Sequence, residues 1–348
     1  METVTFEQVI NRGCGIDVHK KLLVATISGE GIKTETREFG TVTRSLTELK
    51  DWLLKNGVTH VAMESTGVYW KPVYHILEPS GLTVWIVNAR HVKNVPGHKT
   101  DKQDSRWLCK LLLAGLLKPS YIPAREQREV RDLTRYRQKL IQDVASNKNR
   151  IIRILEDCNV KLSSVLSDTG GVTATRLIDK LCDEKTVTMA DIDEVYTKKI
   201  EASKEEIFEA CNGSITDHHI YLLGTIRENN RHIESLIQDL DDKIKDVLAP
   251  YDNALERLRE IPGLNRKSVE DLIAEIGLDM NVFPSEKHLC SWVGVSPGNN
   301  ESAGKKKWSH CPRKQTGQNN PDTIRLGCIT YKKHVLSCPL SPTSCPPW

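Results

Sequence analysis

The sequence has no long hydrophobic run. Its 348 residues include no stretch of about eighteen consecutive apolar residues, the length that a membrane-spanning helix needs. The N-terminus, Met-Glu-Thr-Val-Thr-Phe-Glu, also lacks the basic start and apolar core of a signal peptide. We therefore expect a cytoplasmic protein without a membrane anchor, and the length favours two or three domains.

Closely paired cysteines are missing as well. The cysteines are scattered along the chain, at Cys14, Cys109, Cys158, Cys182, Cys211, Cys290, Cys311, Cys328, Cys338 and Cys345. Even with His310 and His334, this spacing does not match the paired ligands of zinc modules. We interpret most of them as reduced, packed residues of a large cytoplasmic chain.

Net charge is small. Lysine and arginine number 49 against 46 acidic residues, which leaves a formal charge of +3. An excess of this size says little about nucleic-acid binding, which depends on where the charges lie.

Residues 13 to 87 alternate between strand and helix patterns. Strands are expected at 13–18, 22–28 and 32–39, then a helix near 46–53, a strand at 58–63, a helix at 69–77 and a strand at 82–87. Three antiparallel strands, then two strands that each follow a helix, predict an open α/β sheet covered on both faces. This is the order of a ribonuclease H-like domain.

Four acidic residues hold distinctive places in this predicted sheet. Asp17 lies inside the first strand, and Glu64 ends the fourth. Asp101 and Asp104 stand three apart at the start of the next helix, on one helical face. Exposed strand ends and a helix cap would explain them one by one. Because the first and fourth strands are neighbours in this topology, the carboxylates can instead converge.

Convergent carboxylates need cations to compensate their charge. Two Mg²⁺ ions, about 3.5–4 Å apart, are the common solution in phosphoryl transfer, and Mn²⁺ also fits. Basic side chains flank the acids, at His19, Lys20, Lys93, His98, Lys99 and Lys102. Each alone is more often a solvated surface residue, but together they suit a phosphodiester substrate. The residues thus predict metal-dependent phosphoryl transfer on nucleic acid.

Two long helices are predicted between residues 123 and 250, separated by two or three short ones within 161–215. Both have apolar residues at three- and four-residue spacing, with Arg137 and Asn147 interrupting the first stripe. They are natural antiparallel partners, within one chain or across a dimer. The outer face of the first helix carries Arg128, Arg131, Arg135, Lys139, Lys148, Arg150 and Arg153. Such a face is either solvated or in contact with phosphate, and both interpretations stay open.

Two further motifs follow. Ile261-Pro262-Gly263-Leu264-Asn265 joins two predicted helices, as in a helix-hairpin-helix whose turn amides hold a phosphate, or as in an ordinary helical corner. Ser302 lies in a loop rich in glycine and asparagine, beside Lys305, Lys306 and Lys307. A hydroxyl there could meet a phosphate, although serines are common in loops.

Five segments together resemble the DEDD transposases of bacterial insertion sequences, a family that includes the bridge-RNA-guided recombinases. They are Gly15-Ile16-Asp17-Val18-His19-Lys20, Glu64-Ser65-Thr66-Gly67, Thr100-Asp101-Lys102-Gln103-Asp104, Ile261-Pro262-Gly263 and Glu301-Ser302-Ala303-Gly304-Lys305. The resemblance implies a ribonuclease H/RuvC-like catalytic domain over 1–122, a coiled-coil region over 123–250 and a helical transposase domain over 251–307.

The same resemblance implies roles for residues and partners. Asp17, Glu64, Asp101 and Asp104 would bind Mg²⁺, and Ser302 would attack DNA and form a covalent phosphoserine link. The active site would be composite, with the serine loop of one subunit meeting the acids of another in a homo-oligomer. A non-coding guide RNA would pair with target and donor DNA, while the protein contacts backbone and shape.

The final segment departs from the family pattern. Residues 308–348 are rich in proline, serine, asparagine and cysteine, with little helical periodicity. We expect a disordered segment produced by a frameshift or by degeneration. Translation of the underlying DNA in the other two frames tests this, and the absence of an apolar helical continuation there would contradict it.

Three functions remain open from the sequence. The first is an RNA-guided recombinase, and the second is a structure-selective nuclease that uses metal-activated water. A Ser302→Ala protein that still cleaves DNA would favour the nuclease. The third is an inactive remnant, which predicts salt-dependent nucleic-acid binding without cleavage.

Overall fold

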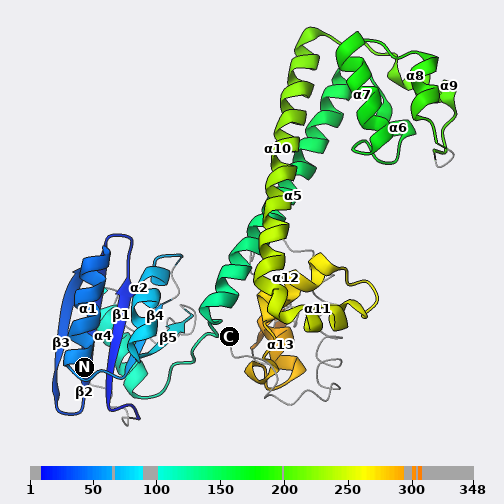
Figure 1. Cartoon of the computed structure of the whole chain (residues 1–348). Coiled ribbons are helices and arrows are strands. Elements are labelled where there is room, and N and C mark those ends of the chain that lie inside the picture. The colour runs from blue at the N-terminus through cyan, green and yellow to red at the C-terminus, as the bar shows by residue number, and fades with distance from the viewer. Residues whose placement is uncertain are drawn as a thin grey trace. The chain divides into compact units, whose positions relative to one another are not determined.

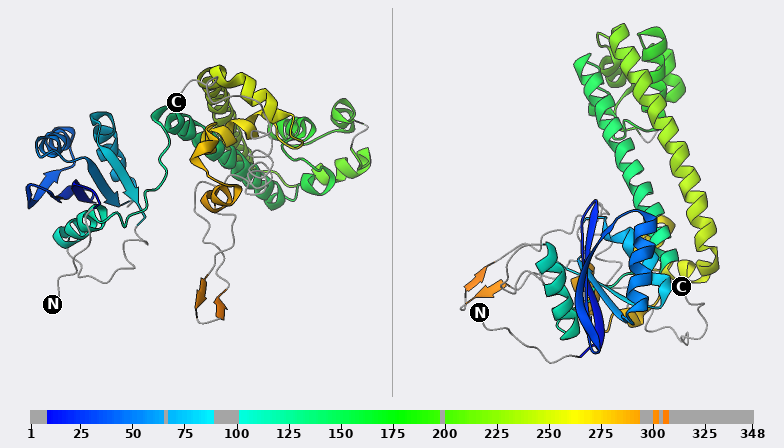
Figure 2. Two further views of the ribbon diagram at one scale, coloured as in Figure 1. Left: turned by 90° about the horizontal axis from the view of Figure 1, so that it is seen from below. Right: turned by 90° about the vertical axis from the view of Figure 1, so that its left-hand side faces the viewer.

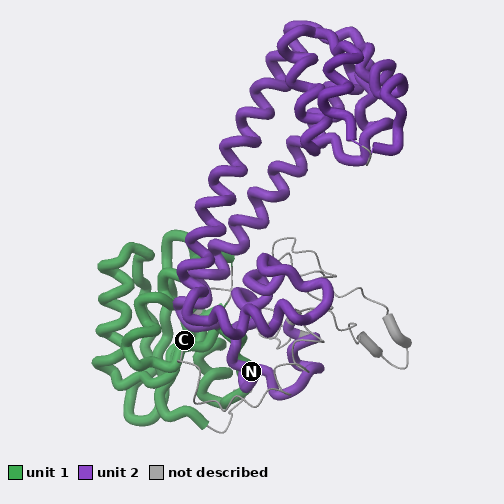
Figure 3. The backbone as a smooth tube through the Cα atoms, turned by 45° about the vertical axis from the view of Figure 1, so that its right-hand side comes forward, with its two compact units in different colours: residues 1–122 green, residues 123–348 purple. Residues whose placement is uncertain are grey.

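The chain divides into two compact units, Met1–Ile122 and Pro123–Trp348 (Figure 3). The computed structural model describes residues 9–64, 67–88, 101–197, 200–293, 300–302 and 305–307. No helix in these ranges combines the length and the apolar character needed to cross a membrane. The finer domain boundaries expected from the sequence stay predictions, and the segment 308–348 lies outside the described residues.

Unit 1 is built on a five-stranded sheet (Figure 1). Its strands are β1 (Arg12–Val18), β2 (Leu22–Gly29), β3 (Ile32–Gly40), β4 (His60–Glu64) and β5 (Thr83–Val87). They lie in the order β3-β2-β1-β4-β5. The first three pair antiparallel, whereas β4 runs parallel to both β1 and β5. The predicted ribonuclease H-like order is therefore confirmed.

Helices cover both faces of this sheet (Figure 2). Along β4 the side chains alternate. Val61 and Met63 join a core formed with α1 (Thr43–Lys55) and α2 (Trp70–Leu77). The short helix η1 (Glu78–Ser80) follows α2 directly in the chain. Ala62 joins a second core with α4 (Asp101–Leu113). The period of two along the strand thus assigns each residue of β4 to one of the two faces.

Gly15 lets α4 lie directly on β1. A Cβ at this position would stand 2.3 Å from the carbonyl oxygen of Ser105 and 2.4 Å from the amide nitrogen of Cys109. Both are backbone atoms of α4, so no side-chain rotation relieves the contact. The buried hydroxyl of Ser105 also bonds the hydroxyl of Thr26 in β2, at 2.8 Å. The helix is therefore fixed against the sheet by backbone approach and a polar contact.

A Gly15→Ala protein should be less stable by about 1–3 kcal/mol, because the added methyl group pushes α4 away from β1. Urea unfolding measures this change in free energy. Gly224→Ala serves as a control, since Gly224 lies in the helix α10 (Asp217–Leu248) with open space around its Cβ position. Alanine there should add up to about 1 kcal/mol of stability. Equal effects of the two substitutions would contradict the close approach.

Two long helices form the centre of unit 2. They are α5 (Arg125–Asp157) and α10, and they lie side by side in Figures 1 and 2. Asn147 donates a buried hydrogen bond to Asn230 at 2.8 Å, and Arg137 contacts Asp241 at 2.8 Å. From the first contact to the second, the residue number falls along α5 and rises along α10. The two helices are therefore antiparallel, and they pair within one chain. Supercoiling of the pair stays a prediction.

A helical cap lies at one end of this pair. The described residues between 161 and 215 form four helices, α6 (Leu162–Val165), α7 (Val172–Glu184), α8 (Met189–Val195) and α9 (Lys204–Cys211). Their apolar side chains share a core with Leu155 of α5 and Leu223 of α10. Two or three short helices were expected here, and the additional one is the single turn α6.

Within the cap, Asp191 holds the start of α8. Its carboxylate accepts hydrogen bonds from the hydroxyl of Thr188 at 2.6 Å and the amide of Thr188 at 2.9 Å. The ammonium group of Lys180 lies 2.9 Å away. The Thr188 hydroxyl, followed by Lys180, lowers the pKa of Asp191 to about 2.

The lowered pKa predicts acid sensitivity of the cap. Because the folded-state pKa lies below the ordinary value of 3.8, the stabilisation from ionised Asp191 is complete above about pH 4 and is lost as the pH falls toward 2. Thermal unfolding of the wild type and of Asp191→Asn should therefore differ at neutral pH and converge near pH 2. A difference that does not change with pH would contradict this.

The other end of the helix pair packs on a second helical group. This group contains η2 (Ala249–Tyr251), α11 (Asp252–Arg259), α12 (Arg266–Ile276), η3 (Met280–Val282) and α13 (Glu286–Val293). Val130 of α5 and Leu248 of α10 complete its core. Later in the chain, two short strands, β6 (Asn300–Ser302) and β7 (Lys305–Lys307), pair antiparallel with each other.

Candidate active site

Asp17 and Glu64 come together at one end of the sheet in unit 1. In the parallel pair β1 and β4, Ile16 aligns with Met63, so Asp17 and Glu64 are the next residues of the same register. Neighbouring strands lie about 4.8 Å apart. Both acids stand at the carboxyl ends of their strands, and the sequence prediction that strands one and four are adjacent is confirmed.

Both acids belong to the face of the sheet that α4 covers. Gly15, two residues before Asp17, faces α4, and Ala62, two residues before Glu64, packs in the core that α4 shares. Residues two apart in a strand lie on the same face. The two carboxylates therefore project from neighbouring strands toward α4.

The first turn of α4 lies at the same end of the sheet. The Cβ position of Gly13 is closest to Leu112, whereas that of Gly15 is closest to Ser105 and Cys109. Moving along β1 toward Asp17 therefore leads toward the N-terminus of α4, where Asp101 and Asp104 lie. Asp104 is exposed, and the side chain of Asp101 is outside the described set. The topology thus brings all four predicted acids to one edge.

His19 contacts the carboxylate of Asp17. Its Nε2 atom lies 3.1 Å from Oδ2 of Asp17, and the Asp17 side chain keeps 18% of its surface exposed. The sequence suggested only a flanking cation at this position. Residues two apart in an extended segment share a side, so the contact could have been expected from spacing alone. His19 can therefore orient one carboxylate oxygen of Asp17.

The donor set suits a hard divalent cation. Carboxylate oxygens on β1 and β4, together with an exposed carboxylate on α4, are the ligand type that Mg²⁺ and Mn²⁺ prefer. Among the side chains that the structure describes, no three His, Cys, Asp or Glu residues lie close enough to form a metal site. The side chain of Asp101 is not among those described, and its role as a ligand stays a prediction.

Lys20 is exposed directly after β1 and stands near Asp17 in the chain. Lys99 lies outside the described residues, and so does the side chain of Lys102. In unit 2, Ser302 and Lys305 are cross-strand neighbours in the register of β6 and β7. The side chains of Ser302, Lys305, Lys306 and Lys307 are likewise not described.

Gly263 occupies the turn between α11 and α12. Its φ of +88° is in the left-handed region, and no atom of the described residues lies within 4 Å of its Cβ position. Asn265 caps α12, since its side-chain oxygen accepts a hydrogen bond from the amide of Ser268 at 2.8 Å. The asparagine thus serves the helix start. Phosphate binding by this turn stays a prediction.

Arg131 and Arg135 make contacts inside unit 2. Arg131 donates to the carbonyl oxygens of Ala274 and Glu275, at 3.2 and 2.6 Å, where α12 ends. Arg135 forms two bonds with the Glu275 carboxylate, at 2.6 and 2.9 Å. These partners lie more than a hundred residues away, so nothing in the local sequence signals them. Nucleic-acid binding by either arginine stays a prediction and would require these contacts to open.

Two family models match the chain. Residues 14–160 match a DEDD-type IS110 model described as transposase, and residues 255–319 match the model of the IS116/IS110/IS902 transposase family. The chain belongs to the IS110 family of transposases. Asp17, Glu64, Asp101 and Asp104 lie in the first matched region of this IS110-type transposase, and Ser302 lies in the second. The second match also includes residues 308–319, the first part of the segment that departs from the expected pattern.

One curated relative and two solved structures are similar to this IS110-type chain. The pilin gene-inverting protein of Moraxella bovis is 31% identical over 86 residues, which are 24% of this chain and 26% of that protein. The chain thus aligns with about a quarter of that relative's length. RuvC of Thermus thermophilus, in complex with a Holliday junction substrate, is 12% identical with a TM-score of 0.25 and covers 32% of this chain and 99% of RuvC. A second Thermus thermophilus RuvC structure is 14% identical with a TM-score of 0.25 and covers 31% and 99%.

Proposed function

We propose that this protein is a metal-dependent DNA transposase that cleaves and exchanges strands at the ends of an insertion sequence. The observation that carries the proposal is the shared register of Asp17 and Glu64 beside the first turn of α4. Membership of the transposase family supports DNA as the substrate. Asp17, Glu64, Asp101 and Asp104 would hold Mg²⁺ or Mn²⁺, which supplies charge stabilisation at the phosphate during strand cleavage.

The chain's own residues would position and neutralise the substrate. His19 holds one oxygen of Asp17 and so fixes the direction of the carboxylate. Lys20, together with Lys99 and Lys102, would offset phosphate charge at the same edge of the sheet. Lys305, Lys306 and Lys307 would do so around the serine loop.

Ser302 is the proposed nucleophile. Its hydroxyl oxygen would form a bond to phosphorus as the bond from phosphorus to a deoxyribose oxygen breaks, and the leaving oxygen takes up a proton. The product is a phosphoserine link between protein and DNA, which a second DNA hydroxyl can reverse. A homo-oligomer would supply Ser302 from one subunit and the acids from another, and a non-coding guide RNA would select donor and target DNA by base pairing.

A covalent-adduct assay tests the proposal. Full-length protein is mixed with Mg²⁺, donor and target DNA, and RNA transcribed from the non-coding sequence that flanks the gene. We expect a protein–DNA adduct that disappears with EDTA, with Asp101→Ala and with Ser302→Ala. Omission of the RNA tests the guide separately.

The other outcomes identify the alternatives. Cleavage that survives Ser302→Ala without an adduct indicates a nuclease that uses water. DNA binding without cleavage at any Mg²⁺ concentration indicates an inactive remnant. Either result overturns the proposal.

A further inference from the structure

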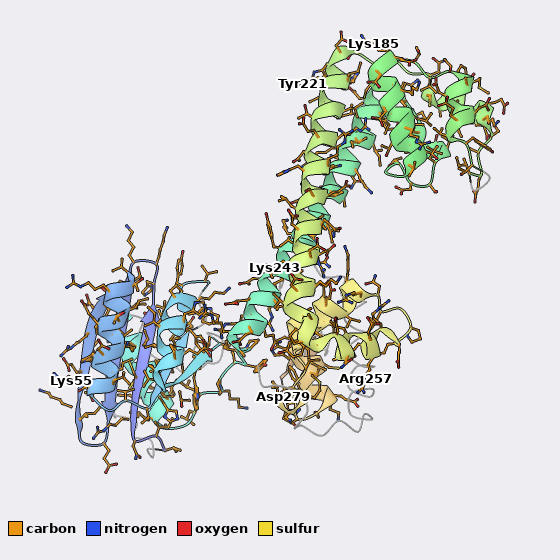
Figure 4. The ribbon with its side chains drawn as sticks, in the orientation of Figure 1. Lys55, Lys185, Tyr221, Lys243, Arg257 and Asp279 are labelled. Atoms are coloured by element: carbon orange, nitrogen blue, oxygen red, sulfur yellow. The ribbon has the colours of Figure 1, made fainter. Side chains whose placement is uncertain are left out.

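The outer face of α5 carries cations that the proposed active site does not use. Lys139, Arg150 and Arg153 are exposed and, with Ser146, follow one another at intervals of seven, four and three residues, so they form one stripe along the helix. We call Lys139, Arg150 and Arg153 the basic stripe. Figure 4 shows α5 and its partner α10 with their side chains, with Tyr221 and Lys243 labelled on α10.

The basic stripe differs in its contacts from several other cations of α5. Arg125 pairs with Glu129, and Arg131 and Arg135 pair with Glu275. Among the described residues, no carboxylate lies within 4.0 Å of a basic-stripe side chain. Arg150 donates only to the amide oxygen of Asn147. Within the part of the chain that the structure describes, these three cations thus have no acidic partner, although acids and bases are nearly equal in number.

Acidic residues are scarce around the basic stripe. Asp143 is the single acid between residues 133 and 155 of α5, and it is half-buried without an ion pair. The part of α10 that faces residues 144–155 contains Glu228 as its single acid over residues 218–233. Most acids of α10 lie further along, at Glu234, Asp239, Asp241, Asp242 and Asp246. The next acids of α5, Glu156 and Asp157, pair with Lys161 and His219. The basic stripe is therefore a line of exposed cations on one face of α5, and not an excess of positive charge over one half of the helix pair.

The stripe has the dimensions of a nucleic-acid contact. With a helical rise of 1.5 Å per residue, Lys139 and Arg150 stand about 16 Å apart along α5. Their long side chains can span the major groove of DNA, which is about 12 Å wide, and contact phosphates on both of its sides. A rigid helix pair presents these charges at a fixed spacing, so little entropy is lost when they bind.

We propose that the basic stripe binds the phosphate backbone of duplex DNA, as a holding site outside the catalytic unit. The inference rests on the proposed function only in taking DNA as the partner. The chemistry that it invokes is backbone neutralisation without base contacts, so binding should be independent of sequence and strongly dependent on salt.

Binding of the full-length chain to a fluorescent DNA duplex of unrelated sequence, measured in EDTA, tests this site. The variant Lys139→Gln/Arg150→Gln/Arg153→Gln should bind at least about tenfold more weakly, and the slope of log affinity against log salt should fall by about 2 to 3. The control Arg231→Gln/Lys243→Gln/Lys245→Gln removes the same charge from exposed positions of α10 and should change affinity less than about threefold.

Three outcomes would overturn the proposed DNA-binding site. Equal loss in both variants would mean that net charge alone attracts DNA. Unchanged affinity in the basic-stripe variant would mean that DNA binds elsewhere. Tighter binding of an RNA duplex of the same length would make RNA the occupant. Since EDTA prevents metal-dependent cleavage, failure of the proposed catalysis does not affect the readout, and circular dichroism confirms that the variants are folded.

Discussion

Replacing Asp17 by asparagine, or Glu64 by glutamine, should lower the rate of DNA cleavage by about 10³-fold. The two acids share one register at the carboxyl ends of β1 and β4, on the face that α4 covers. Each substitution keeps the shape of the side chain but removes the charge that would hold a divalent ion. The loss corresponds to several kcal/mol of transition-state stabilisation.

Single-turnover cleavage of labelled DNA at saturating Mg²⁺ measures this rate, and calorimetric titration with Mn²⁺ measures the accompanying loss of metal affinity. Asp51→Asn is the matched control, because Asp51 is an exposed acid on α1 of the same unit. It should cleave at the wild-type rate. Full activity in Asp17→Asn or Glu64→Gln would remove these residues from the metal site.

Arg137→Met should destabilise unit 2 by about 3–5 kcal/mol. The Arg137 side chain has 0% of its surface exposed and contacts Asp241 at 2.8 Å, Glu270 at 2.7 Å and Asp271 at 2.8 Å. Burial lowers the pKa of Arg137, but the hydrogen bonds that its guanidinium donates to Glu270 and Asp271 outweigh this effect and raise the pKa above its ordinary value. Removing the guanidinium leaves three carboxylates at a buried site without their shared partner.

Urea unfolding of the full chain measures this loss, with Arg153→Met as the control. Arg153 is exposed, so its substitution should change stability by less than about 0.5 kcal/mol. Burial already raises the pKa of Asp271, and loss of Arg137 should raise it further. The deficit of Arg137→Met should therefore shrink as the pH falls and this carboxylate takes up a proton. A deficit equal to that of the control would contradict a structural role.

The sequence predicted the fold best where the periodic spacing of apolar residues determines which face of a strand or helix is buried. Alternation along β4 places Val61 and Met63 on one face of the sheet and Ala62 on the other, and the strand order follows from the sequence of elements. That order makes β1 and β4 neighbours, and the structure adds the register that aligns Asp17 with Glu64. The metal-binding roles of these acids stay predictions.

Long-range ion pairs were not predictable in this way. Arg131 and Arg135 have the spacing of a solvated face, yet Glu275, which they contact, is supplied by α12. Arg137 interrupts an apolar stripe, and only the arrangement of α5, α10 and α12 shows that it is buried among carboxylates. The spacing of charged residues predicts which of them share a face of a helix, but it does not predict which other element packs on that face.

The buried hydrogen bond between Asn147 and Asn230 has a consequence for the length of the long helices. Sliding one helix along the other would place each amide opposite an apolar side chain, so the bond fixes their alignment. Deleting seven residues from both helices, on the same side of this bond, keeps the amides paired and produces a shorter rod. Deleting seven from one helix alone forces a mismatch. The length of the helix pair can therefore change only by equal steps in both helices, counted from the Asn147–Asn230 bond.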